Sequence, residues 1–151
     1  MSRVLKRVLF VCIGNACRSQ MAEGFARSYG ADVLIPASAG ISPATNIAPD
    51  TRRAMAEKGI DVRDQFPKSL RHLARAEFDL VINMSGFDIP DSTGAEIRSW
   101  DVPDPVYLKY EEHCEVRDAI ETLVMALVLE LRRAQNQPQF RGFGSGRLDP
   151  R

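Results

Sequence analysis

Two side chains that can do chemistry together, a thiol and a guanidinium, stand close to each other near the N-terminus. Cys12 and Arg18 enclose a stretch of mostly small residues, and Ser19 follows directly. A thiolate is a strong nucleophile. An arginine can hold two oxygens of a tetrahedral anion in a bidentate fork, which a lysine cannot do. This pair at this spacing suggests attack by sulfur on a phosphate-like oxyanion.

The residues between Cys12 and Arg18 are suited to bind such an anion through main-chain N–H groups. Gly14 lets the backbone approach an anion closely, and Asn15 tolerates left-handed backbone geometry. Successive amides in such a loop form a concave anion site, and the positive end of a following helix favours the same charge. This field also favours the thiolate of Cys12. The residues expected to bind the oxyanion are Ile13, Gly14, Asn15, Ala16, Cys17, Arg18 and Ser19.

The elements on either side of the loop must hold it at one edge of a sheet. Residues 8–11 form a continuous apolar, β-rich run, which is typical of a buried parallel strand. After the loop, apolar residues recur at helical spacing from Met21 to Tyr29, and Gly30 supplies a stop. This order places Cys12 at the carboxyl end of a strand, where parallel sheets bind their ligands. A buried core cysteine, the ordinary alternative, explains the thiol but not the loop around it.

Strands and helices continue to alternate along the rest of the chain. Further strands are predicted at 33–40, with an interruption at Pro36, at 78–82 and at 97–100. Further helices are predicted at 49–58, 69–76 and 116–131. The alternation predicts α/β architecture in a single domain, with a four-stranded parallel sheet flanked by helices. We expect this domain to span residues 1–133, and residues 134–151, rich in Gln, Gly, Pro and Arg, to form a disordered tail.

Composition excludes several classes of function. The chain has 20 basic and 20 acidic residues, a balance that gives no support for binding to nucleic acid or to a membrane surface. No apolar stretch is long enough to span a bilayer, and the apolar run before Cys12 is too short for a signal peptide. Three cysteines suggest a reduced, cytoplasmic protein rather than a disulfide framework. His72 and His113 do not stand at metal-ligand spacing with the cysteines, so we expect them to have surface or helix-capping roles. We expect no cofactor.

The segment from Val11 to Ser19 closely resembles the active-site signature of low-molecular-weight protein tyrosine phosphatases and the related thioredoxin-coupled arsenate reductases. The resemblance extends from Val8 to about Arg133. It includes Ser38-Ala39-Gly40, Gly59-Ile60-Asp61, Phe78-Asp79 and Asp104-Pro105.

The resemblance implies roles for the matched positions. Cys12 would be the nucleophile, Arg18 the oxyanion clamp and Asp104 the general acid, while Asn15, Ser19 and Ser38 would form the hydrogen-bond network that supports the loop. A carboxyl group such as that of Asp104 can protonate the leaving oxygen of a phosphate ester and then activate water. Cys17 would form a reversible protective disulfide with Cys12.

The reductase branch of the resemblance also includes a potassium site near the loop, matched in part here. Asn15, Glu23 and Ser38 correspond to positions of that site, and Lys68 stands at the remaining acidic position. We expect the Lys68 ammonium to take the place of the cation, and no metal is predicted.

The sequence leaves the reaction itself open between two branches of the family. Gln20 to Gly24, Gln65 and Val106 resemble the reductases, whereas residues 83–88 lack the cysteine pair that thioredoxin-coupled reductases carry there. On these chemical grounds we predict phosphomonoester hydrolysis through a phosphocysteine intermediate, with phosphotyrosine or small aryl phosphates as substrates. The alternative is an arsenate reductase that uses an external thiol or a glutaredoxin-type partner. A third alternative is a non-catalytic regulatory protein that binds an oxyanion.

Overall fold

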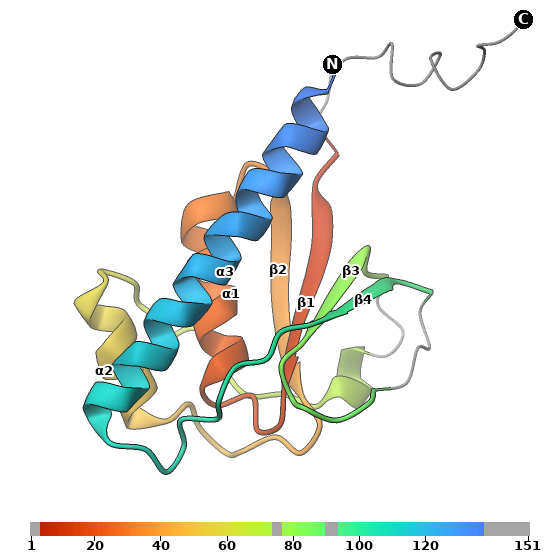
Figure 1. The fold of residues 1–151 in the computed structure, drawn as a ribbon. Coiled ribbons are helices and arrows are strands. Elements are labelled where there is room, and N and C mark those ends of the chain that lie inside the picture. The colour runs from red at the N-terminus through yellow and green to blue at the C-terminus, as the bar shows by residue number, and fades with distance from the viewer. Residues whose placement is uncertain (1–3, 74–76, 90–93, 138–151) are drawn as a thin grey trace, which may run out of the picture.

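A computed structural model describes residues 4–73, 77–89 and 94–137, and its centre is a parallel sheet (Figure 1). The sheet has four strands, and every pair of neighbours is parallel. From edge to edge the strands are β2 (Leu34–Gly40), β1 (Lys6–Cys12), β3 (Leu80–Asn83) and β4 (Glu96–Ser99). This confirms the predicted α/β domain with a four-stranded parallel sheet.

Three α-helices cover one side of this sheet and its lower end in Figure 1. They are α1 (Arg18–Gly30), α2 (Pro49–Glu57) and α3 (Tyr110–Asn136). The larger hydrophobic core lies between the sheet and α1 and α3, where the alternate β1 residues Val8 and Phe10 are fully buried. On the opposite face, Leu9 and Val11 belong to a smaller cluster that includes residues of a 3₁₀ turn at Leu70–Leu73. The period-2 alternation of β1 therefore feeds both cores.

Several strands and helices begin or end at residues other than those predicted. Strand β2 runs through Pro36, because it is an edge strand of the described sheet and edge strands tolerate a residue without an N–H group. Only the 3₁₀ turn Leu70–Leu73 occupies the predicted helix 69–76, whose last residues lie outside the described part of the chain. Helix α3 begins at Tyr110, before the predicted residue 116, and continues to Asn136. The predicted boundary at residue 134 is therefore wrong, because residues 134–136 are the last residues of α3. Residues 138–151 are not described, so disorder there stays a prediction.

No helix within the described ranges is both long enough and apolar enough to cross a membrane.

Gly40 fits the end of β2 against the loop that follows β1. Cys12 and Gly40 are register partners at the ends of their strands. A Cβ atom on Gly40 would lie 2.7 Å from the carbonyl oxygen of Ile13 and 2.9 Å from the amide nitrogen of Asn15. Both atoms belong to the backbone of the loop and cannot rotate away. Only glycine allows this approach of two backbones.

Substitution Gly40→Ala should therefore displace the loop and destabilise the fold by about 1–3 kcal/mol, the usual cost of overpacking. Gly14→Ala is the matched control, because the nearest atoms to a Cβ on Gly14 are 3.9 Å away; its effect on stability should stay within about 0.5 kcal/mol. Urea unfolding measures both changes, and phosphate affinity by calorimetry should fall in the Gly40 variant. A Gly40→Ala protein as stable as wild type would contradict this packing.

Candidate active site

The loop between β1 and α1 is held from outside through its carbonyl oxygens. The carbonyls of residues 12–17 each accept a hydrogen bond from a neighbouring group. The donors are the main-chain amides of Ile41, Ser42, Ala44, Ala48 and Met21 and the side-chain amide of Gln20. In a trans peptide the C=O group and the next N–H group point in opposite directions. The amides of residues 13–18 are therefore turned to the inner side of the loop, as an anion site requires.

Asn15 makes the sharpest turn in this loop. It has a positive φ of 51°, and among the described residues it is the one non-glycine residue that does. Its side chain fixes the turn from both ends of the amide group: Nδ2 donates to Ser19 Oγ (2.7 Å) and Oδ1 accepts from the Lys68 amide (2.9 Å). Left-handed backbone at an asparagine is tolerated, and here the hydrogen bonds stabilise it.

The sulfur of the predicted nucleophile is in contact with the hydroxyl of Ser19. Cys12 Sγ lies 2.9 Å from Ser19 Oγ, and both residues are buried. Because the Asn15 amide already donates to the Ser19 oxygen, the hydroxyl's own hydrogen can point at the sulfur. A hydrogen bond of this direction stabilises a thiolate. Asn15 and Ser19 thus support the loop from behind.

A chain of polar side chains extends this support along α1 to Arg27, by way of Gln65. Gln20 Nε2 donates to the Asn15 carbonyl (2.9 Å), Gln65 Nε2 donates to Gln20 Oε1 (2.7 Å), and Arg27 donates to Gln65 Oε1 (2.7 Å). Gln20 and Gln65 are both buried. Buried polar side chains that are fully paired in this way define one conformation. The sequence singled out neither glutamine for this role.

Ser38 acts on α1 instead of on the loop itself. Its hydroxyl donates to Glu23, a buried carboxylate that also pairs with the Arg27 guanidinium. The Lys68 ammonium donates to the Phe66 carbonyl (3.0 Å). Arg27 is the cation in direct contact with Glu23, and the charge of Glu23 also acts on the Lys68 ammonium. The expectation that Lys68 takes the place of the cation stays a prediction. Within the described residues, no three His, Cys, Asp or Glu side chains are grouped as metal ligands would be.

Arg18 is the first residue of α1, and its buried guanidinium is oriented by two carbonyl groups. Nη1 donates to the carbonyl oxygens of Met84, after β3, and of Val102 (2.9 Å), after β4. This leaves the Nε–Nη2 edge, the edge that binds oxyanions in a bidentate manner. Asp104 Oδ2 lies 3.5 Å from Nη2. Two loops that follow neighbouring strands thus fix the predicted clamp.

One cavity of about 270 Å³ contains the predicted nucleophile, clamp and acid together. Asp104 is 39% exposed at its edge, and Tyr107, 95% exposed, stands beside it. Asn15 and Ser19 are fully buried behind the loop and do not line the cavity. The lining residues are Cys12, Ile13, Gly14, Ala16, Cys17, Arg18, Ala44, Asp104, Val106 and Tyr107.

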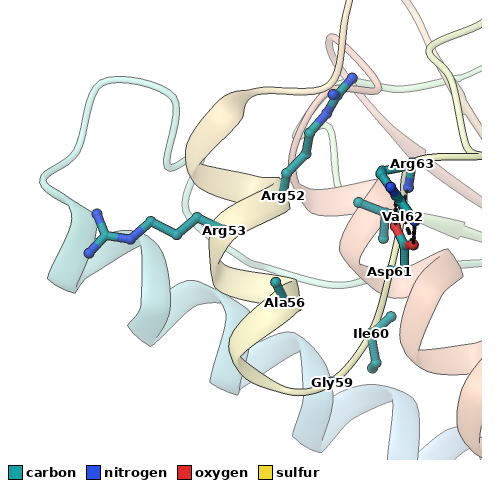
Figure 2. A pocket seen from close by; sticks show the side chains of 8 residues that line it. All are labelled: Arg52, Arg53, Ala56, Gly59, Ile60, Asp61, Val62 and Arg63. Carbon is teal, nitrogen blue, oxygen red and sulfur yellow. Dashed lines mark hydrogen bonds and ion pairs between the residues drawn. The ribbon is translucent and has the colours of Figure 1, made fainter.

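A larger cavity of about 550 Å³ lies between α2 and residues 59–63 (Figure 2). Arg52, Arg53 and Arg63 surround it, and Ala56 and Ile60 are among its apolar residues. Arg63 is paired with Asp61, and the guanidinium of Arg53 turns outward to the ring of Tyr110. This cavity contains no cysteine or other nucleophile, so the smaller cavity is the candidate active site.

The two thiols of the smaller cavity differ in their surroundings. Burial raises the pKa of the Cys17 thiol to about 11, and a hydrogen bond with Thr51 offsets only part of this effect. Cys17 is therefore a neutral thiol near pH 7. Cys12 has the Ser19 hydroxyl as its hydrogen-bond partner instead.

The prediction of a surface or capping role for His113 is wrong. The ring is 2% exposed, and its Nε2 atom lies 2.9 Å from Thr51 Oγ1 on α2. Burial lowers the pKa of His113 below its ordinary value. Nothing in the local sequence indicates this position, because the residue faces the core only through the packing of α3 on α2. His72, by contrast, is exposed.

Comparison with known families decides which group of proteins this site belongs to. The family model described as low molecular weight phosphotyrosine protein phosphatase matches residues 7–137. The chain belongs to this family. It is therefore an enzyme of the low molecular weight phosphatase fold, which does not support the alternative of a non-catalytic regulatory protein.

Within the low molecular weight phosphatase family, the matched relatives are mainly arsenate reductases. The chain is 32% identical over 131 residues to a glutaredoxin arsenate reductase of Synechocystis sp., covering 84% of this chain and 99% of that protein. It is 34% identical to arsenate reductase 1 of Bacillus cereus, covering 76% and 88%. A solved arsenate reductase in the phosphate binding state superposes with a TM-score of 0.77 at 30% identity, covering 84% and 99%. These relatives favour the alternative prediction, arsenate reduction, over phosphate ester hydrolysis.

The geometry of the cavity predicts that an oxyanion shields Cys12 selectively. At a phosphate concentration about ten times its Kd, alkylation of Cys12 by iodoacetamide at pH 7 should slow about tenfold, since only the free site reacts. Cys114 is the matched control, because it lies on α3 outside this cavity, 3.9 Å from Glu57, and should react at an unchanged rate. Cys17 should stay unlabelled until the pH approaches 11. Peptide mass spectrometry resolves the three sites, and equal protection of Cys12 and Cys114 would contradict the assignment.

Proposed function

We propose that this protein reduces arsenate to arsenite, with Cys12 as the nucleophile and an external thiol as the reductant. The observation that carries the proposal is that relatives covering most of the chain are named arsenate reductases, one of them a glutaredoxin arsenate reductase. Arsenate and phosphate are both tetrahedral oxyanions, so inward amides and one guanidinium suit either of them. The reaction is decided by what happens after the anion has bound.

The proposed first step joins sulfur to arsenic. Cys12 attacks arsenic acid, H₃AsO₄, to give Cys12–S–AsO(OH)₂ and one water molecule. The amides of residues 13–18 and the Nε–Nη2 edge of Arg18 would bind the arsenate oxygens. Asp104, in the same cavity, would protonate the oxygen that leaves as water. Preorganised donors of this kind do not have to reorient while charge moves.

The second and third steps need two thiols. A thiol RSH attacks the Cys12 sulfur to form Cys12–S–S–R, and the electron pair of the S–As bond stays on arsenic, which leaves as As(OH)₃. A second thiol RSH then attacks the sulfur of the R group in this mixed disulfide, which releases the disulfide R–S–S–R and returns Cys12 to the thiol form.

These thiols come from outside the chain in our proposal. Residues 83–88, which begin at the last residue of β3, contain no cysteine. Cys17 is a buried neutral thiol, and Cys114 is near Glu57 rather than in the cavity. A small thiol or a glutaredoxin-type carrier is the expected donor.

Hydrolysis of phosphate monoesters is a second candidate, favoured by one observation. Asp104 and Tyr107 both line the cavity of Cys12, where the carboxyl could protonate an aryl leaving group and the ring could lie against it. The same phosphocysteine chemistry would then end with water instead of a thiol.

A direct comparison of the two reactions tests the proposal. We expect arsenite formation with glutathione and glutaredoxin, or with another thiol system, to exceed phosphate release from p-nitrophenyl phosphate. Cys12→Ser should abolish turnover, and Asp104→Asn should lower kcat by about 10²–10⁴-fold, the usual contribution of a general acid. Cys114→Ser is the control and should leave the rate unchanged. Rapid release of phosphate without arsenite formation in any thiol system would reject arsenate reduction.

We further propose that Cys17 protects Cys12 by forming a reversible disulfide with it. Both thiols line one cavity, and they are close enough to interact electrostatically. After treatment with hydrogen peroxide, wild type should regain nearly all of its activity on addition of dithiothreitol. Cys17→Ala should instead lose activity permanently, because an unprotected sulfenic acid is oxidised further. Equal recovery of the two proteins would count against the disulfide.

A further inference from the structure

His113 is a buried ring that contacts Thr51 on α2 and Pro105 in the loop of Asp104, and it does not line the cavity itself. Thr51, its neighbour on α2, is fully buried. The ring therefore cannot be explained as solvated surface. On one side, His113 contacts the loop that contains Asp104. On the other side, it contacts Thr51, which lies next to the loop that contains Cys12.

The hydrogens in these contacts can be assigned from the partners. His113 makes a backbone hydrogen bond with Pro105. Proline has no N–H group, so the carbonyl oxygen accepts and a ring N–H donates. Nε2 faces Thr51 Oγ1 at 2.9 Å, so the remaining nitrogen, Nδ1, carries the hydrogen. The ring is neutral in this arrangement, and Nε2 accepts from the Thr51 hydroxyl.

Thr51 continues the connection to the loop of Cys12. Its hydroxyl is also a hydrogen-bond partner of the Cys17 side chain. The backbone supports the same junction: the Ala48 amide donates to the Ala16 carbonyl (3.1 Å), and the Thr51 amide donates to the Ala48 carbonyl (3.0 Å). The first turn of α2 is thus attached to the phosphate-binding loop at two points.

Pro105 connects the ring of His113 to Asp104, the predicted general acid. It is buried, whereas the neighbouring Asp104 side chain is 39% exposed. The Pro105 carbonyl also accepts from the Leu108 amide (3.0 Å). The anchoring of residue 105 therefore determines where the exposed carboxyl of residue 104 stands over the cavity.

We propose that His113 is a positioning residue that ties the Asp104 loop, through the Pro105 carbonyl, to the phosphate-binding loop, through Thr51 and Cys17. It holds Asp104 at a fixed distance from Cys12 without touching the substrate. The effect on turnover rests on the proposed function, because it requires Asp104 to act as the acid. The hydrogen-bond arrangement does not depend on which reaction the site catalyses.

Three substitutions separate the links of this chain. His113→Asn can place an amide N–H near the position of Nδ1 and keep the bond to Pro105. His113→Gln can reach Thr51 but not Pro105, and Thr51→Val removes the hydroxyl with little change of shape. We expect His113→Gln to lower kcat by about tenfold, a part of what the acid contributes, and His113→Asn to retain more activity. The phosphate affinity of both His113 variants should stay within about twofold of the wild-type value, because the loop amides and Arg18 bind the anion. His72→Asn, on an exposed histidine, is the control.

A double-mutant cycle with Asp104 distinguishes positioning from a general loss of stability. In an Asp104→Asn background, His113→Gln should cause no further loss of kcat, because the group that it positions is gone. Thermal unfolding checks that each protein is folded. Additive losses of kcat in the double variant, or an unchanged kcat in folded His113→Gln, would overturn the proposal.

The ring itself gives a readout that is independent of the reaction. Nitrogen-15 NMR of wild type should show a neutral His113 with hydrogen on Nδ1 at pH 7, and Thr51→Val should shift Nε2. Hydrogen on Nε2, or a charged ring, would overturn the arrangement even if arsenate is reduced. If wild type reduces no arsenate but shows the Nδ1–H form, the proposed function fails and the link between the loops stands.

Discussion

The site depends on the outward orientation of the carbonyl groups in the loop that follows β1. Residues 12–17 each give their carbonyl oxygen to a donor outside the loop, and this turns the amides of residues 13–18 toward one point. Six N–H groups that point at one place repel one another. The hydrogen bonds on the outer side of the loop hold them in this orientation before an anion binds. An anion would then bind without the cost of rearranging the backbone. The low exposure of Cys12 and the small size of the cavity follow from the same closed loop.

Much of this site could be predicted because its decisive groups are side chains in one short segment. Cys12, Arg18 and the strand–loop–helix order follow from residue types and spacing, and the structure places Asp104 in the same cavity. The outer donors could not be predicted in this way. Ile41 and Ala48 contribute main-chain amides, and any residue except proline carries such a group. Their role arises from the path of the chain after β2, for which no side chain gives a signal.

His113 and Pro36 show two further limits of sequence reasoning. The sequence around a histidine does not show whether its ring faces solvent or a buried threonine. For His113, the packing of α3 against α2 places the ring next to Thr51. Pro36 interrupts a strand pattern only if both neighbours of the strand are present, whereas β2 has one neighbour in the described sheet. In both cases the tertiary position of an element decides the outcome, and a local pattern does not contain that position.

The choice between two reactions at one site follows from the fate of the Cys12 adduct. Inward amides and Arg18 stabilise any tetrahedral oxyanion of suitable size, so they cannot discriminate between phosphate and arsenate chemistry. Water resolves a phosphocysteine, whereas a thiol resolves an arsenic adduct, because arsenic(V) accepts the electron pair of the S–As bond. Since residues 83–88 supply no thiol and Cys12 is only 2% exposed, an external thiol would have to reach the sulfur through the cavity that Val106 and Tyr107 also line. The specificity of such an enzyme would reside in what that cavity admits after the first step, rather than in how the anion is held.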